Sequence, residues 1–277
     1  MLGADYYVHN IDPEIIHLWG QFGLRYYGLA YALGFIIAII IMRRLHKKGL
    51  LSLNPEQQST ALFALILGVM IGGRLGHMLL YDLNGFLSNP LTFFEIWKGG
   101  MASHGGFAGV LVACWWIAKK YKIGFWKLSD VLATMTPPGL MLGRIANFIN
   151  GELWGKPTDV SWAVIFPQSA PYGTPIDLIP ARHPSQLYEA ALEGLLLVIY
   201  TQWRMWKTKA PLTPGRLCGE FLILYAIVRI IGEQFREPDA SLIMGVNPGI
   251  FYSFFIVLLG AVFIYFSIRN AAQKKAH

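Results

Sequence analysis

The sequence predicts an all-α protein that crosses a membrane about seven times. Of its 277 residues, 55% are apolar and only 14% are charged, and the mean hydropathy is +0.45. A typical soluble domain carries about 25% charged residues, so this chain has too little charge to cover a water-facing surface. Apolar segments of about 20 residues, the length that spans a bilayer core, recur along the chain. We therefore expect residues 1–277 to form a single membrane-embedded domain.

Seven apolar segments are expected to form the transmembrane helices. They run over residues 24–42, 60–80, 105–118, 131–149, 185–200, 217–233 and 250–268. In the second segment Gly68, Gly72 and Gly76 recur at every fourth position, a spacing that favours close packing against another helix. The fourth segment contains Pro137 and Pro138, which should interrupt its helix because proline lacks an N–H and clashes with the preceding turn.

The distribution of lysine and arginine predicts how the chain is oriented. The loops after the first, third and fifth segments, together with the C-terminal tail, hold 15 of these residues, whereas the alternate loops hold five. Because basic residues favour the cytoplasmic side, the N-terminus should lie outside and the C-terminus in the cytoplasm. The net charge of +7 is therefore a topology signal, and no nucleic-acid partner is expected.

The longest outer loop, about residues 150–184, contains six prolines and should form a small periplasmic cap. Residues 161–166 could form a short strand within it.

Ionisable residues within the apolar segments gather at the ends that are predicted to face outward. A charge inside a bilayer costs several kcal/mol, so such residues are interpreted first as functional. Arg74, Arg144 and Arg229 lie near the outer ends of the second, fourth and sixth segments. Further residues at this depth are Tyr27, His104, Glu189, Glu193 and Glu233. Only Glu220 lies toward the cytoplasm, so the sequence predicts one polar site in the outer half of the membrane.

Structural roles compete with function at several of these positions. Arg229 and Glu233 are four residues apart and could form an intrahelical ion pair as readily as a binding site. Arg74 could extend to the outer headgroups, and for this residue the structural role is favoured. Glu189 and Glu193 could each pair with an arginine for packing alone. Several arginines and a histidine at one depth are stronger evidence for function than any single residue.

Arginines at headgroup depth indicate a site for an anionic lipid, because the guanidinium stays charged and its planar donors suit phosphate. His104 could accept a proton near neutral pH. Gly105 and Gly106 would let the backbone approach a ligand closely, although glycine there could equally serve helix packing. Further donors and acceptors follow Arg144 at Asn147, Asn150 and Glu152.

Residues 143–155, GRIANFINGELWG, closely resemble the signature of bacterial prolipoprotein diacylglyceryl transferases. Four further matches are Tyr27-Gly28, His104-Gly105-Gly106, residues 182–189, and residues 229–236 followed by Pro238-Asp239. The resemblance covers nearly the whole chain and implies seven helices with the N-terminus outside. One departure is Val246, where the family usually has glutamine after Met244-Gly245, and it bears on the start of the last helix.

The resemblance implies a transferase of the bacterial cytoplasmic (inner) membrane. Such enzymes move the diacylglyceryl group of phosphatidylglycerol to the lipobox cysteine thiol of a preprolipoprotein signal peptide. A thioether forms and glycerol phosphate leaves, as the first step of lipoprotein maturation. The partners would be phosphatidylglycerol, lipobox signal peptides and membrane lipids. Cys114 and Cys218 fit no metal spacing, and no metal or organic cofactor is expected.

The resemblance also implies a set of site residues. We expect His104 as the candidate base, with Arg144 and Arg229 as the other catalytic residues. The phosphatidylglycerol-binding set is Tyr27, Arg144, Asn147, Asn150, Glu152, Gly155, Glu233 and Arg236. In this set Glu233 would orient Arg229, and Arg236 would gate or steer from the outer rim. Supporting positions are Arg74, Gly105, Gly106, His183 and Glu189.

Two other classes of protein could use buried charges in this way. A secondary transporter or lipid flippase usually places its site at the bilayer midplane and shows an internal repeat. Here the site is expected in the outer half, and no repeat is visible. A non-catalytic lipid-binding scaffold is the third interpretation.

Overall fold

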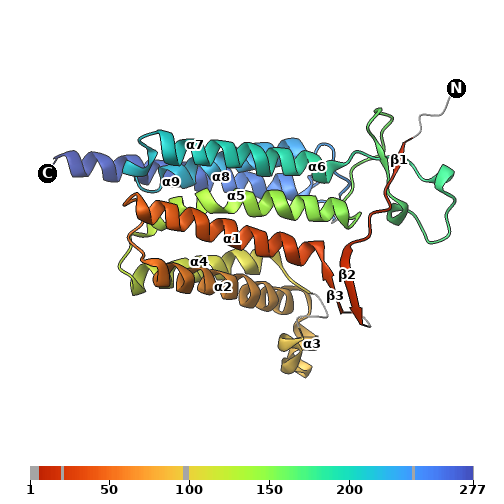
Figure 1. The fold of residues 1–277 in the computed structure, drawn as a ribbon, viewed down its shortest axis with the longest axis horizontal. Coiled ribbons are helices and arrows are strands. Elements are labelled where there is room, and N and C mark those ends of the chain that lie inside the picture. The colour runs from red at the N-terminus through yellow and green to blue at the C-terminus, as the bar shows by residue number, and fades with distance from the viewer. Residues whose placement is uncertain (1–5, 20–21, 96–99, 239–240, 277) are drawn as a thin grey trace. The chain divides into compact units, whose positions relative to one another are not determined.

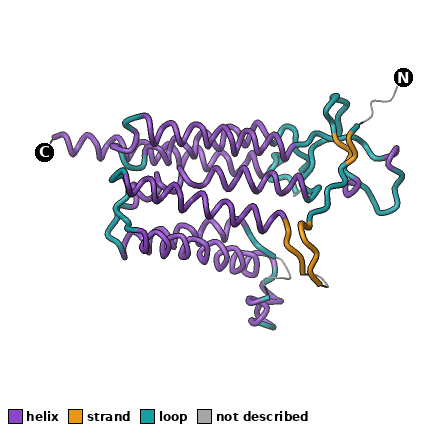
Figure 2. The backbone as a smooth tube through the Cα atoms, viewed as in Figure 1, coloured by secondary structure: helices purple, strands orange, loops and turns teal. Residues whose placement is uncertain are grey.

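The computed structural model describes residues 6–19, 22–95, 100–238 and 241–276, and these are mostly helical (Figures 1 and 2). The chain divides into two compact units. The first unit contains Met1–Ala38 and Leu132–His277, and the second contains Ile39–Val131. The polar side chains at the ends of α5, α6 and α8 all belong to the first unit.

Helices lie at all seven of the predicted segments. They are α1 (Tyr26–Lys47), α2 (Pro55–Tyr81), α4 (Ser103–Lys120), α5 (Phe125–Ile149), the continuous run of α6 (Ser185–Glu189), η5 (Ala190–Leu196) and α7 (Leu197–Lys207), α8 (Arg216–Gly232) and α9 (Pro248–Ala276). Within the described residues three helices, α1, α2 and α9, are long and apolar enough to cross a membrane. The helical class is confirmed, and membrane crossing by the other four remains a prediction.

In the second unit, α2 packs closely on α4 through glycines. A Cβ atom on Gly72 would collide with the carbonyl oxygen of Gly105, and one on Gly68 would collide with that of Gly109. Only glycine allows two helix backbones to approach this closely, which confirms the packing predicted from the four-residue spacing. The short helices α3 (Leu83–Ser88) and η1 (Pro90–Phe94) follow α2.

Helix α5 runs through Pro137 and Pro138 without a break, so the predicted interruption is wrong. Pro138 has no N–H to donate to the carbonyl oxygen of Thr134, four residues earlier. Gln202 of α7 donates from Nε2 to that oxygen at 2.9 Å. The helix continues because a neighbouring side chain satisfies the freed carbonyl.

The helices of the first unit pack around a small apolar core. Ala133 of α5, Leu197 of α7, and Phe221 and Val228 of α8 form this buried cluster. Many of the exposed side chains of α9 are large and apolar, with Leu258 63% exposed, as expected of a helix that faces lipid. A 3₁₀ turn, η6 (Ala210–Leu212), connects α7 and α8.

Two small sheets lie in the first unit. Strand β1 (Tyr7–Val8) pairs in parallel with β4 (Val164–Ile165), and β2 (Glu14–Trp19) pairs antiparallel with β3 (Phe22–Arg25). Strand β4 confirms the short strand predicted within residues 161–166, whereas the β2–β3 hairpin was not predicted. The rest of the 150–184 segment is irregular apart from η3 (Pro167–Ser169) and η4 (Ile176–Leu178).

Candidate functional site

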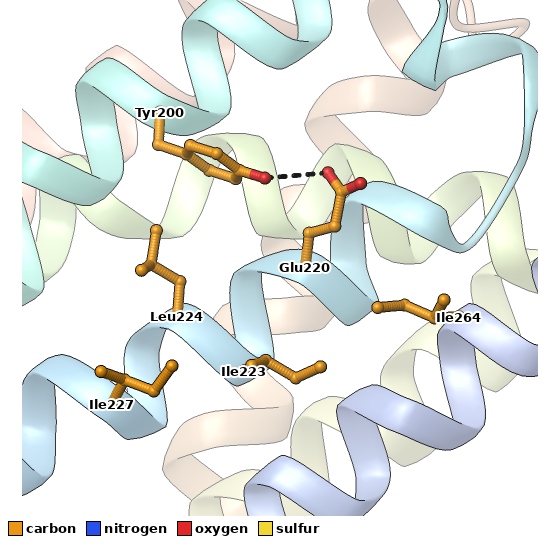
Figure 3. A pocket seen from close by; sticks show the side chains of 6 residues that line it. All are labelled: Tyr200, Glu220, Ile223, Leu224, Ile227 and Ile264. Carbon is orange, nitrogen blue, oxygen red and sulfur yellow. Dashed lines mark hydrogen bonds between the residues drawn. The ribbon is translucent and has the colours of Figure 1, made fainter.

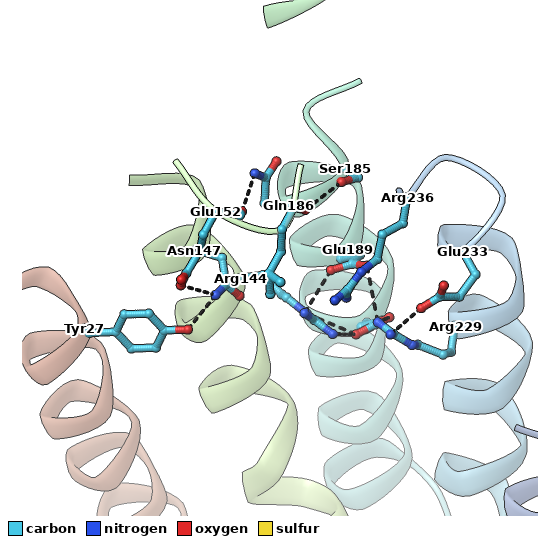
Figure 4. A network of polar contacts seen from close by, with 12 residues as sticks. Tyr27, Arg144, Asn147, Glu152, Ser185, Gln186, Glu189, Arg229, Glu233 and Arg236 are labelled. Atoms are coloured by element: carbon cyan, nitrogen blue, oxygen red, sulfur yellow. Dashed lines mark hydrogen bonds and ion pairs between the residues drawn. The ribbon is translucent and has the colours of Figure 1, made fainter. Parts of the chain in front are cut away.

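Three arginines and three glutamates form one ion-pair network in the first unit (Figure 4). We call it the arginine–glutamate network, and its members are Arg144, Glu189, Glu193, Arg229, Glu233 and Arg236. Helix α5 supplies the first arginine, α6 and η5 supply two glutamates, and α8 with the residues after it supplies the rest. Three segments that are distant in sequence therefore meet at one polar site.

Glu189 contacts all three arginines of the network. Its Oε1 accepts hydrogen bonds from Nη1 of Arg229 at 3.2 Å and from Nη1 of Arg236 at 3.3 Å. Its Oε2 lies 3.0 Å from Nη1 of Arg144, as an ion pair without hydrogen-bond alignment. The carboxylate is fully buried, so the three cations compensate the cost of removing it from water.

Glu193 bridges the two arginines that the sequence analysis proposed as catalytic. Oε2 accepts from Nη2 of Arg144 at 2.9 Å, and Oε1 accepts from Nη1 of Arg229 at 3.0 Å. Glu193 lies in η5, a π-helical stretch of a kind that is rare and often marks functional sites. The next residue, Gly194, packs so closely on α5 that a Cβ atom would lie 2.5 Å from Cβ of Met141. This close approach lets Glu193 reach Arg144.

The predicted intrahelical ion pair between Arg229 and Glu233 is present. Arg229 also contacts Glu189 and Glu193, so its guanidinium is held from three directions. A side chain fixed in this way loses little further conformational freedom when it binds a ligand, which is the physical advantage of preorganisation.

The network is formally neutral, yet its two kinds of side chain differ in exposure. Glu189 and Glu193 have no exposed side-chain surface, and Glu233 has 2%. The side chains of Arg144 and Arg229 are 17% and 14% exposed. An incoming anion would therefore meet guanidinium groups, while the carboxylates stay behind them. This arrangement suits a phosphate, for which the arginine fork is well shaped.

A second polar cluster adjoins the network through α5. Asn147 lies three residues after Arg144 and therefore on a neighbouring part of the same helix face. Its Nδ2 donates to the hydroxyl of Tyr27 at 2.5 Å and to Oε1 of Glu152 at 2.8 Å. The amide thus ties the start of α1 to the signature loop after α5 (Figure 4). Three of the predicted binding residues are brought together here.

Ser185 and Gln186 hold the signature loop, a role that the sequence analysis missed. Gln186 donates from Nε2 to the carbonyl oxygen of Glu152 at 2.6 Å, and Ser185 donates to that of Leu153 at 3.1 Å. Leu153 has a φ of +56°, which for a residue other than glycine persists only where the surroundings fix the backbone. Both residues fall within the matched residues 182–189, and this match is the sequence signal that could have identified them.

Gly155 is a packing position within this loop. Its N–H donates to the carbonyl oxygen of His183 at 2.9 Å, and an added Cβ would lie 2.5 Å from that oxygen and 2.6 Å from the carbonyl oxygen of Phe235. The ring of His183 makes an edge contact with the ring of Phe235, and its Nδ1 lies 3.2 Å from the hydroxyl of Tyr188. Burial, with a smaller effect of Lys156, lowers the pKa of His183 below its usual value.

Arg236 and Asn150 are two further residues of the predicted binding set. Arg236 is only 4% exposed and pairs with Glu189, so the structure places it inside the network and not at an outer rim. The expectation of a rim position is corrected, because a carboxylate is available to hold this arginine in the interior. Asn150 has its Oδ1 buried, without a hydrogen-bond partner among the described residues.

The other predicted residues lie in the second unit. Arg74 is buried and donates to main-chain carbonyl oxygens of the segment after α3, at 2.5 Å to Thr92, 3.2 Å to Phe93 and 3.2 Å to Gly100. It therefore anchors a local loop and does not extend to headgroups. Gly105 serves the contact between α2 and α4. His104 and Gly106 lie in the first turn of α4, and the His104 side chain lies outside the described residues.

Fold and site together define a helical membrane protein in which buried glutamates hold several arginines in ion pairs. Residues 13–266 match the family model described as prolipoprotein diacylglyceryl transferase. A protein of Ruegeria pomeroyi named phosphatidylglycerol–prolipoprotein diacylglyceryl transferase is 44% identical over 249 residues, which cover 86% of this chain and 84% of the relative. A protein of the same name from Pasteurella multocida is 42% identical and is covered over 96% of both chains.

The chain belongs to the prolipoprotein diacylglyceryl transferase family. The family predicted from the signature motif and the enzyme class, a transferase acting in lipoprotein modification, are thereby confirmed.

Proposed function

We propose that this protein transfers the diacylglyceryl group of phosphatidylglycerol to the lipobox cysteine thiol of preprolipoproteins. The observation that carries the proposal is the pair of arginines, Arg144 and Arg229, which share Glu193 and keep their exposed surface for an anion. The names of the relatives support the choice of the two substrates, and the partly exposed guanidinium groups support a phosphate position at this site.

The proposal includes the placement of the protein in the bacterial inner membrane. All seven apolar helices would cross it, with the N-terminus outside, the site near the periplasmic leaflet and residues 150–184 as a periplasmic cap on one membrane-embedded domain. The uneven distribution of 15 basic residues against five supports this orientation. Among the residues that the structure describes, three helices have the length and hydropathy of membrane spans.

The proposed reaction is a displacement at a saturated carbon. The cysteine thiolate attacks the glyceryl carbon, a carbon–sulfur bond forms, and the carbon–oxygen bond to phosphate breaks. The electron pair leaves with the oxygen of glycerol phosphate, and the thiol proton passes to a base. A free thiol has a pKa of about 8.5, so a base accelerates the reaction near neutral pH. His104 is the proposed base.

The arginines would stabilise the charge that develops on the departing phosphate. One of Arg144 and Arg229 would hold the phosphate before reaction, and the other would engage the leaving oxygen. Glu233 orients Arg229 through their ion pair. Tyr27, Asn147 and Glu152, already joined by hydrogen bonds, would shape the headgroup pocket. Asn150, Gly155 and Arg236 complete the proposed binding set, with Arg74, Gly105, Gly106, His183 and Glu189 as its supports.

The test uses purified protein, phosphatidylglycerol and a lipobox peptide, with mass spectrometry of the peptide. We expect a diacylglyceryl mass gain on cysteine, and none on a peptide with serine in its place. His104→Gln should lose turnover while lipid still binds. A lipobox peptide left unmodified by the wild-type protein would indicate a transporter or flippase. If His104→Gln and Arg144→Ala each lose lipid binding and activity in parallel, a non-catalytic scaffold is favoured.

A further inference from the structure

A cavity of about 280 Å³ lies beside α8 (Figure 3), toward the end of the helix that the orientation in the proposed function assigns to the cytoplasm. Its lining comes from α7, α8 and α9, and consists of Tyr200, Glu220, Ile223, Leu224, Ile227 and Ile264. All of these residues belong to the first unit. Glu220 and Arg229 are nine residues apart on α8, which corresponds to about 14 Å at the helical rise, so this cavity is separate from the proposed substrate site.

The polar edge of the cavity carries more positive than negative charge. Glu220 accepts from Nε of Arg204 at 2.7 Å, from Nη2 of Arg204 at 2.6 Å and from Nε of Arg216 at 3.0 Å. Tyr200 donates its hydroxyl to the same carboxylate at 3.1 Å. Two guanidiniums thus face one carboxylate, and the side chain of Arg216 is 46% exposed. One positive charge remains for an anion at this edge.

The remaining lining is hydrocarbon. Ile223, Leu224, Ile227 and Ile264 present only methyl and methylene groups, and Ile227 is 46% exposed. Trp203, on the neighbouring turn of α7, is 52% exposed and contacts Arg204 through its ring. An aromatic ring beside a cation is typical of the membrane–water interface. The cavity is therefore an apolar recess that opens toward lipid beneath a basic edge.

We infer that this recess binds an anionic phospholipid that is not the substrate. One acyl chain occupies the space between Ile223, Ile227 and Ile264, and the phosphate lies on the exposed edge of the Arg216 guanidinium. Basic pockets between membrane helices on the cytoplasmic side are a recurring form of lipid site. Charge complementarity selects an anionic over a zwitterionic lipid, because only the former offsets the surplus cation.

The experiment places the full-length protein in phosphatidylcholine nanodiscs with a trace of phosphatidic acid that carries a photoactivatable group in one acyl chain. Adducts are mapped by mass spectrometry. We expect labelling of the α8 peptide that contains Ile223 and Ile227, and much weaker labelling there by the matched phosphatidylcholine probe. Equal labelling by the two probes at this peptide would overturn the inference, because it would indicate ordinary contact with bulk lipid.

Two variants with matched controls sharpen the test. Ile227→Trp fills the recess and should abolish the adduct, whereas Leu258→Trp, at an exposed position on α9 outside the recess, should preserve it. Arg216→Gln should weaken phosphatidic acid labelling about fivefold, the effect of one basic residue near a membrane surface, and the exposed Lys209→Gln should not. Labelling that is insensitive to both Ile227→Trp and Arg216→Gln contradicts the proposal.

Discussion

Arg144 donates two hydrogen bonds to a single oxygen of Glu193, from Nε at 3.3 Å and from Nη2 at 2.9 Å. The second oxygen of the same carboxylate holds Arg229. Two like charges can stand side by side only because an anion lies between them. Glu193, together with Glu189, which also contacts both arginines, therefore sets their spacing, and a phosphate that binds both of them would bind a preformed pair.

Glu193→Gln keeps the shape of the side chain and removes its charge. Because two buried guanidiniums lose a shared partner, we expect the protein to lose about 3–5 kcal/mol of stability and most of its peptide-modifying activity. Thermal unfolding in detergent and the lipobox-peptide assay measure the two effects. Glu237→Gln is the control, since the ion pair of Glu237 with Arg182 is exposed on the glutamate side and should contribute about 0–1 kcal/mol. A Glu193→Gln variant that melts and reacts like the wild type would show that the bridge is unimportant.

Tyr27 and Asn147 should behave as a coupled pair. Their hydrogen bond joins α1 to α5. Either substitution alone breaks this bond, so the second substitution should cause little further loss of activity. We expect Tyr27→Phe and Asn147→Ala to be non-additive in activity, with a coupling energy of about 0.5–3 kcal/mol from a double-mutant cycle. Tyr31→Phe, at an exposed position on α1, is the control partner for Asn147→Ala. Strict additivity for the Tyr27 cycle would argue against a shared pocket.

The contribution of Gln202 to stability should depend on Pro138 in another helix, because Pro138 cannot bond the carbonyl oxygen that Gln202 satisfies. Gln202→Leu leaves the Thr134 carbonyl oxygen unsatisfied inside the protein, at an expected cost of about 1–3 kcal/mol. Pro138→Ala restores an N–H to that carbonyl and should offset part of the loss in the double variant. Melting temperatures of the single and double variants test this. If Pro138→Ala lowers the melting temperature equally in the wild type and in Gln202→Leu, Gln202 does not compensate for the missing N–H of Pro138.

His183 should make the protein less stable in mild acid. Its pKa is lowered in the folded state by burial and by Lys156. The unfolded chain therefore takes up a proton near pH 6.5 that the folded protein resists, so stability is retained above this pH and falls as the pH drops below it. Melting temperatures between about pH 7.5 and 5 should decline less steeply in His183→Asn than in the wild type. If the melting temperatures of the wild type and His183→Asn decline equally with pH, His183 is not the source of the acid sensitivity.

The sequence was informative where the physics is local. Apolar length placed helices at all seven segments, and glycine spacing predicted that the second segment packs closely on another helix. The four-residue separation of Arg229 and Glu233 offered an intrahelical ion pair as one of two interpretations, and the pair is present. Tertiary relationships were less accessible. The continuity of α5 depends on Gln202, 68 residues beyond the carbonyl that it satisfies. The central place of Glu189 depends on where α5, α6 and α8 meet.

The β2–β3 hairpin was missed for a different reason. Register shifts between Glu14 and Ile16 and between His17 and Trp19 break the regular alternation by which strands are recognised. The direction of the His104 side chain is also beyond local reasoning, since position in the sequence fixes only its place at the start of α4.

The most direct test of the central claim is a structure of the protein with bound phosphatidylglycerol. We predict that the lipid phosphate lies within hydrogen-bond distance of both Arg144 and Arg229, with Glu193 behind them. A phosphate seated elsewhere, with the two guanidiniums still bound only to glutamates, would contradict it.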